Sequence, residues 1–380
     1  MKNASSKLFS IALCIVLSTV LITAGTSAGI DIDSNTPSME GYDWFYDSVT
    51  HTLILDNANL QYINADGIDL DIKLVGKNTI QGGIEKKDSD GNSYLCGIYL
   101  NAGTLEFLES SSGNLQITID GTETDSGCVK GIFAESTKSD VWIRGGIVSV
   151  TVIGKDVSAV SSSGVAIWND GTLDIIASAS GHDSKATGIY GSTQIRDNGK
   201  VAVSASSDGV TYGIHSTSGS LMIKENGKLT VITYGNVFSC GVSVVYTAEL
   251  YSGLSSAEIT ASGKTAYGIY LDSEEDIPEA SDIFISGGET VIKGDTQAVY
   301  IPDRASFIVP SSHSINAADN TDGAGSKTVT AVEIRKNDSS YKYIQITPKW
   351  IENLPFVAGV AAVVILIIAG LIFFVVKRRK

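Results

Sequence analysis

The side chains in this sequence best suited to chemistry are aromatic rings that follow a recurring phrase, glycine or alanine and then isoleucine or valine. If the isoleucine or valine points into a core, the alternation of a strand turns the next residue outward. Six of the eight residues in that position are Phe, Trp or Tyr, types that make up only 8% of the chain. Sugar rings stack their apolar faces on such side chains, which predicts a track for an extended glycan. The residues are Tyr99, Phe133, Trp168, Tyr190, His215, Ser243, Tyr270 and Tyr300.

A structural role explains the same rings. Aromatic side chains in register on neighbouring strands stack on one another, which is worth roughly 0.5 to 1.5 kcal/mol per pair beyond burial. Long loops between strands would also cover such a ladder. A glycan track and a stacked structural ladder are therefore both compatible with the pattern.

Paired carboxylates are the other candidates. Asp69 and Asp71 are two residues apart, so on one strand they share a face at a separation of roughly 6.6 Å. That distance suits an acid and base pair or a cation such as Ca²⁺, although most such pairs are simply solvated. His-Glu-x-x-His and Gly-x-Ser-x-Gly motifs are absent from the sequence. No catalytic residue and no cofactor is assigned, and Ca²⁺ and a β-helix lyase or hydrolase stay as alternatives.

The elements that would position these residues follow from repetition. Copies of the phrase run from Gly67-Ile68-Asp69 to Ala298-Val299-Tyr300, at steps of 30, 34, 35, 22, 25, 28, 27 and 30 residues. Alternating segments such as 114–119 and 146–152 lie between them and indicate half-buried strands, and the pair Asn198-Gly199 is typical of a tight turn. A repeat of this length predicts an all-β solenoid, a single-stranded right-handed parallel β-helix with terminal caps. A β-propeller and an antiparallel sandwich are the alternatives.

The repeats divide the chain. We expect a linker over 29–40, an aromatic-rich N-terminal cap over 41–64 and the β-helix over 65–310. Residues 311–350 would form a C-terminal cap and stalk, with a hairpin between the alternating runs 329–335 and 341–347. Both caps are needed because a rod of stacked strands has open edges.

Both ends of the sequence indicate export. Residues 1–28 combine early lysines, an apolar stretch and small residues before a cleavage point, which is typical of a signal peptide. Residues 354–376 carry no charge and are long enough to span a bilayer as a helix, and the basic tail 377–380 would stay in the cytoplasm. The expected product is a single-pass type I membrane protein with an extracellular ectodomain.

The net charge of the chain limits the classes of partner that it can bind. Of the 27 basic residues six lie at the two ends, whereas all 42 acidic residues lie within 29–353, so the ectodomain carries a net charge near −21. Nucleic acid is excluded as a partner because its binding needs clustered Lys and Arg. Neutral glycans or cations are favoured instead. Cys96 and Cys240 each precede a repeat glycine and are expected to be small buried core residues rather than reactive thiols.

The pattern Trp44-x-Tyr46-Asp47-Ser48 and the coils with Gly-Ile-Tyr and Gly145-Gly146-Ile147-Val148 resemble secreted β-helix surface proteins of anaerobic bacteria, often labelled carbohydrate-binding domain proteins. The resemblance spans roughly residues 40–350. It implies a pectin-lyase-like fold and a surface location, and it carries over no catalytic residue. The expected function is a membrane-anchored adhesion protein for a polysaccharide or host glycan; a ligand-free envelope spacer is a further alternative.

Overall fold

The computed structural model describes residues 28–349 apart from 88–90, 123–127, 218, 246, 251–254, 272–281, 303–304 and 336–339. Most of the expected signal peptide and all of the expected membrane helix and basic tail lie outside these residues. Across the described residues, no helix has the length and apolar character needed to cross a bilayer.

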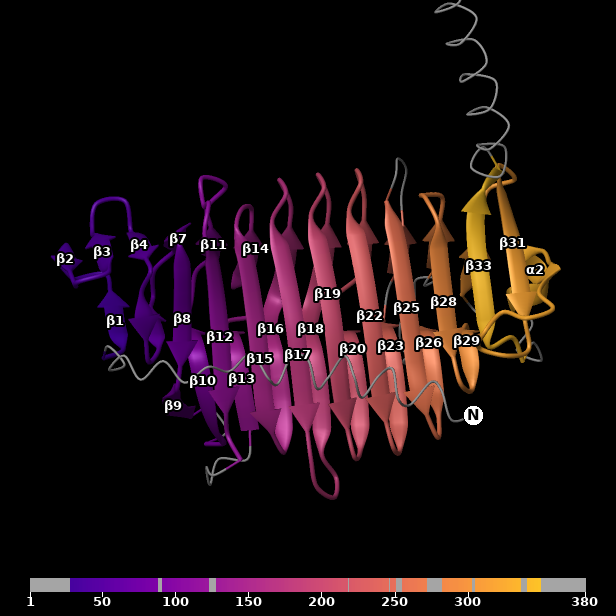
Figure 1. Ribbon diagram of the computed structural model, residues 1–380, viewed down its shortest axis with the longest axis horizontal. Coiled ribbons are helices and arrows are strands. Elements are labelled where there is room, and N and C mark those ends of the chain that lie inside the picture. The colour runs from indigo at the N-terminus through magenta and orange to yellow at the C-terminus, as the bar shows by residue number, and fades with distance from the viewer. Residues whose placement is uncertain are drawn as a thin grey trace, which may run out of the picture.

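The chain winds through three ribbons of strands in a fixed order, first, second and third, and then repeats (Figure 1). Within each ribbon, strands from successive coils pair in parallel. The first ribbon consists of β1 (Ile30–Asp33), β6 (Ile63–Asp66), β10 (Ser93–Leu100), β13 (Cys128–Ala134), the first halves of β16 (Asp156–Ile167) and β18 (Lys185–Ile195), β20 (Val210–Ser216), β23 (Phe238–Val244), β26 (Ala266–Leu271) and β29 (Gln297–Tyr300).

The second and third ribbons complete each coil. The second consists of β4 (Thr52–Asp56), β7 (Leu70–Val75), β11 (Leu105–Phe107), β14 (Asp140–Ile143), the second halves of β16 and β18, β21 (Leu221–Ile223), β24 (Thr247–Leu250), β27 (Asp282–Ile285) and β30 (Ser306–Ile308). The third consists of β5 (Asn59–Leu60), β8 (Lys77–Gln81), β12 (Asn114–Asp120), β15 (Ile147–Gly154), β17 (Thr172–Ala179), β19 (Lys200–Ser207), β22 (Lys228–Gly235), β25 (Ser256–Gly263) and β28 (Thr290–Gly294).

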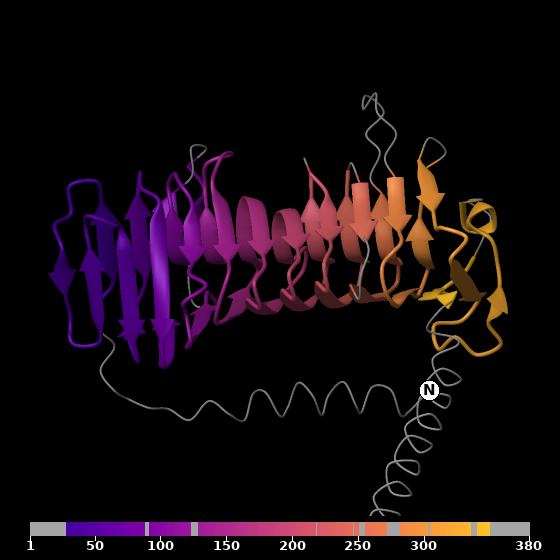
Figure 2. The same ribbon diagram turned by 90° about the horizontal axis from the view of Figure 1, so that it is seen from above.

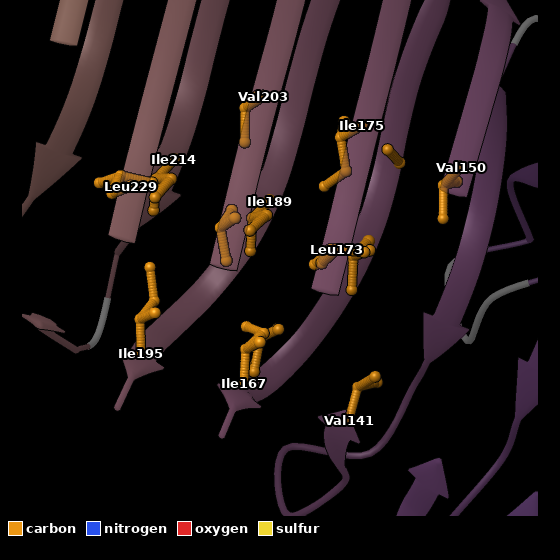
Figure 3. Close-up of a cluster of buried hydrophobic side chains, with 14 of the residues drawn as sticks. Val141, Val150, Ile167, Leu173, Ile175, Ile189, Ile195, Val203, Ile214 and Leu229 are labelled. Atoms are coloured by element: carbon orange, nitrogen blue, oxygen red, sulfur yellow. The ribbon is translucent and has the colours of Figure 1, made fainter. Parts of the chain in front are cut away.

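The stacked coils form an elongated rod (Figure 2). Its interior is filled mainly by aliphatic side chains from all three ribbons, since alternate residues of coil strands such as β15 and β19 are buried. Figure 3 shows this packing for Val141, Val150, Ile167, Leu173, Ile175, Ile189, Ile195, Val203, Ile214 and Leu229. The all-β architecture and the parallel pairing that the sequence predicted are confirmed, and they are compatible with a β-helix.

The N-terminal cap is a small antiparallel meander. Its strands are β2 (Met39–Glu40), β3 (Trp44–Asp47) and β4, and Tyr46 on β3 is fully buried at the end of the core. The linker expected over 29–40 is wrong in this structure, because β1 and β2 lie in it and β1 pairs with β6. The alternation of buried Ile30 and Ile32 with exposed aspartates explains that pairing.

The C-terminal cap differs from the hairpin expected between 329–335 and 341–347. Residues Ala331–Arg335 form a short helix, α2, and β33 (Tyr343–Pro348) instead pairs antiparallel with β28 and with β31 (His313–Ala318), which also pairs with β32 (Lys327–Thr328). A capping box starts the helix: Thr330 Oγ1 accepts the Glu333 backbone N–H at 3.3 Å and Glu333 Oε2 accepts the Thr330 N–H at 2.7 Å. A further strand, β9 (Ile84–Lys87), lies antiparallel to the start of β10.

Candidate functional site

The repeated phrase lies on the first ribbon, with two exceptions. The first is Gly67-Ile68-Asp69, because Ile63 and not Ile68 is in register with Ile98. Ile98 is in register with Ile132, which is in register with Val160 and then with Ile189. Ile167, which the sequence placed in this series, belongs instead to the second ribbon. The irregular steps of 35 and 22 residues thereby become 28 and 29.

Trp168 is therefore absent from the ladder on the first ribbon. The residue in its expected place is Ser161, which pairs with Phe133 on one side and Tyr190 on the other. The local Ala-Ile-Trp sequence matched the phrase, but strand β16 is long enough to contribute to two ribbons and its true copy lies seven residues earlier. The placement of Trp168 in the ladder is thus corrected.

The glycines of the phrase are required by a close approach between ribbons. A Cβ at Gly131 would lie 2.2 Å from Val150 Cγ1, and one at Gly188 would lie 2.3 Å from Val203 Cγ1. Both the glycine and the following residue thus face the interior, so the residue before the glycine lies on the outer side. That position holds Cys96 and Cys240, which are buried as expected, but beneath outer side chains rather than in the main core.

The ladder begins with a closed outer cluster. Tyr94, Cys96, Tyr99 and Phe133 bury one another, with Tyr94 and Phe133 packed edge to face at 4.9 Å between ring centroids. Tyr99 and Phe133 lie on the outer side of the strands as expected, but they are only 7% and 8% exposed, so they are not the open rings that a glycan track needs. Burial raises the pKa of the Cys96 thiol to about 12 and that of both tyrosines above their usual range.

Polar groups close this cluster further. Lys130 Nζ lies 3.3 Å from the Phe133 ring centroid and Lys86 Nζ lies 4.5 Å from that of Tyr99. The Tyr99 hydroxyl donates a hydrogen bond to Glu135. With ring faces and hydroxyl engaged, the cluster stabilises the coils and offers no ring to a ligand.

Further along the rod the rings form a contiguous band that we call the aromatic strip. The band contains four side chains of the expected ladder. It also contains Tyr212 and Tyr267, which directly precede a repeat glycine, and Phe238, which begins β23. Two pairs stack nearly in parallel, Tyr212 with His215 at 4.1 Å and Tyr270 with Tyr300 at 4.7 Å, and the others meet at 5.3 to 6.2 Å. The strip comprises Tyr190, Tyr212, His215, Phe238, Tyr267, Tyr270 and Tyr300.

The rings of the strip stay partly open. Tyr190 is 37% exposed, and the other six side chains are half-buried. Ser243 is buried and interrupts the ladder within the strip, where the space beside it is spanned by contacts of Phe238 with Tyr267 and Tyr270. Tyr212, Phe238 and Tyr267 were not predicted from the sequence, although Tyr212 and Tyr267 each directly precede a repeat glycine.

His215 is the titratable group inside the strip. Its ring stacks on Tyr212 and packs against the edge of Tyr190, and within the described structure its Nδ1 is buried without a hydrogen-bond partner. Burial, assisted by the charge of Lys185, lowers the pKa of His215 to about 4. The imidazole is neutral at physiological pH and behaves as one more flat ring.

Trp168 lies on the outer face of the second ribbon together with Trp142. The two indoles meet edge to face at 5.7 Å, and the Arg196 guanidinium lies 4.0 Å from the Trp168 ring centroid. They line a groove of about 370 Å³ that also contains Asp140 and Gln194. Nothing in the local sequence brings Trp142 and Trp168 together, because their contact depends on strand register.

The two carboxylates of the expected pair have different surroundings. Asp69 is exposed and its Oδ1 accepts the Thr104 N–H at 2.7 Å, whereas Asp71 is half-buried on β7 and lies in register with Glu106. Burial and then the charges of Glu106 and Asp69 raise the pKa of Asp71. Among the described residues no group of three or more His, Cys, Asp or Glu could hold a metal ion.

Comparisons with protein-family models, with curated proteins and with solved structures found no match for this chain. The resemblance to pectin-lyase-like surface proteins therefore stays a prediction.

Proposed function

We propose that this chain is an extracellular, membrane-anchored adhesion protein that binds an extended neutral glycan along the aromatic strip. The observation that carries the proposal is the run of seven contacting, partly open rings over successive coils. We take the stacked coils to be a right-handed parallel β-helix, in which this run follows the axis of the rod. The glycan is a polysaccharide or a host glycan.

The geometry of the strip suits a chain rather than a single sugar. Neighbouring coils are about 4.8 Å apart, so rings on successive coils offer apolar surface continuously along the axis. Sugar C–H groups and aromatic faces both lose water on contact, which favours stacking. Tyrosine hydroxyls at the rim, such as that of Tyr190, which is 3.1 Å from Thr217 Oγ1, add hydrogen bonds that suit sugar hydroxyls.

Charge favours a neutral ligand. The segment between the two ends carries a net charge near −21, which repels acidic polysaccharides and nucleic acid. The signal sequence and the uncharged segment 354–376 support export and attachment to the lipid bilayer as a type I protein, with the strip outside the cell.

A second candidate function is a β-helix lyase or hydrolase. Asp71 and Glu106 are adjacent rungs on the outer face of the second ribbon, and Glu106 is held by Arg144 at 2.9 Å. A carboxyl with a raised pKa beside a salt-bridged carboxylate is an arrangement that acid and base catalysis uses. A ligand-free spacer predicts neither binding nor turnover.

The test is a glycan array probed with residues 29–349, followed by titration of the best neutral polysaccharide. Replacing Tyr270 and Tyr300 together with alanine should weaken that binding at least about tenfold, since two stacking partners are lost. Tyr234→Ala is the matched control, because Tyr234 is 50% exposed on the third ribbon and outside the strip.

The contrary outcomes are distinct. Equal binding by the double variant and the wild type, with the same circular dichroism, refutes the strip as the binding surface. If the wild type releases new reducing ends from the polysaccharide and Asp71→Asn does not, the proposed function is hydrolysis rather than adhesion. If the wild type neither binds a glycan nor releases reducing ends, the result supports a ligand-free spacer.

A further inference from the structure

The outer face of the second ribbon contains a slot centred on the coil of β16, within a groove whose lining extends from Trp142 to Met222. Outward positions in register along this face are Trp142, Ala166, Gln194 and Met222, and beside them Asp140, Gly164 and Ser192. At these two positions the coil of β16 contributes only the methyl group of Ala166 and the hydrogen of Gly164, whereas the coils on either side carry larger side chains. The groove lined by these residues follows from that gap.

The slot has room for one ring between two walls. Adjacent strands are about 4.8 Å apart, so Trp142 and Gln194, two coils apart, arise from backbones separated by about twice that distance. A ring inserted between them needs contacts of about 3.5 to 4.0 Å on each side. A single six-membered ring meets this requirement, and a second ring beside it does not.

The tryptophan wall is held rigidly. Arg196 covers the Trp168 ring at 4.0 Å, and the edge of one indole packs on the other at 5.7 Å. Arg144, which lies 5.7 Å from the Trp168 ring centroid, is itself fixed by Glu106 at 2.9 Å. Such preorganisation reduces the entropy lost when a ligand binds.

The slot contains polar atoms that can accept hydrogen bonds from the hydroxyl groups of a ligand. The Asp140 carboxylate lines it, and a Cβ at Gly164 would lie 2.6 Å from Asp140 Oδ1, so the glycine is needed to leave that oxygen room. Ser163 donates a hydrogen bond to Oδ1 at 3.1 Å.

We propose that this slot binds one neutral pyranose residue, stacked on Trp142 and hydrogen-bonded through its hydroxyls to Asp140. A carboxylate accepts hydroxyl hydrogens and repels anions, so uronic acids and phosphates are excluded. The site is separate from the aromatic strip and does not rest on glycan binding there.

The experiment uses methyl glycosides of neutral hexoses and the methyl glycoside of a uronic acid as probes, titrated into residues 29–349 and followed by saturation-transfer NMR. We expect a neutral glycoside to bind with a Kd on the order of 1 mM, as befits one ring, and the uronic acid to fail. Ala166→Leu fills the slot from its floor and should weaken binding at least about tenfold.

Ala202→Leu is the matched control, because Ala202 is exposed on the third ribbon. Asp140→Asn should weaken binding of the neutral glycoside by roughly three- to tenfold, because the hydrogen bond loses its charge assistance. The Tyr270 and Tyr300 double alanine variant should bind it as the wild type does, which separates failure of the slot from failure of the strip. Absence of binding by every neutral glycoside, equal binding by Ala166→Leu, or preference for the uronic acid overturns the proposal.

Discussion

At the scale of single residues, His215 shows how burial converts a titratable side chain into a structural ring. It is stacked between aromatic neighbours, and its folded pKa of about 4 is below the unfolded value of 6.5. Between these two pH values the unfolded chain binds a proton that the folded chain does not. The fold is therefore stabilised above pH 6.5, and this contribution is lost as the pH falls towards 4.

We expect His215→Phe to flatten the acid side of the stability profile. The wild type should lose of the order of 1 to 3 kcal/mol between pH 6.5 and 4 through this one group, and the variant should not. Chemical denaturation at pH 7, 5.5 and 4 measures the difference. The control is His182→Asn, since His182 is 93% exposed; parallel profiles for wild type and His215→Phe would contradict the assignment.

A second residue-scale prediction concerns the glycine of the phrase. At Gly188 a Cβ would lie 2.3 Å from Val203 Cγ1 and 2.5 Å from the Gly213 carbonyl oxygen. Gly188→Ala should therefore lower the free energy of unfolding by about 1 to 3 kcal/mol through overpacking. Ser204→Ala, exposed on the neighbouring β19, should change it little. A thermal melt of the three proteins decides, and an unchanged melting temperature for Gly188→Ala would disprove the close approach.

At the scale of elements, the C-terminal cap closes the open end of the third ribbon. β33 lies antiparallel on β28, where a further parallel coil would otherwise add, and it packs buried Ile344 and Ile346 on the end of the core. The reversal of direction ends the parallel series, and β31 and β32 extend the sheet as a short antiparallel edge. Such an edge protects a β-rod from pairing end to end.

Ile346→Asp should release this cap, because a buried carboxylate without a partner is costly. The uncovered edge of β28 is then free to pair with another molecule, and we expect concentration-dependent oligomers by light scattering during gel filtration. Val332→Asp, at a 66% exposed position of the same cap, is the control. If Ile346→Asp stays as monodisperse as the control, the cap is not what keeps the end of the rod closed.

At the scale of the whole molecule, the rod presents different chemistry on its faces. The first ribbon carries the closed aromatic cluster and then the aromatic strip, and the second carries the carboxylates and the tryptophan slot. Each outward position recurs once per coil. A substitution at one position therefore changes one coil and leaves the corresponding side chains of the neighbouring coils in place. This arrangement lets a stable scaffold carry separate binding surfaces.

The sequence by itself determined the repeat, the strands and the need for caps, because period-two alternation and turn residues act within a few positions. It also predicted that Ile98, Ile132 and Ile189 face inward, which the structure confirms. Only the tertiary structure decided that Trp168 leaves the ladder for Trp142, and that Tyr99 and Phe133 are buried whereas Tyr190 is open. The reason is physical: the side of a strand is a local property, whereas register between coils of unequal length and exposure of an outer ring depend on residues about thirty positions away.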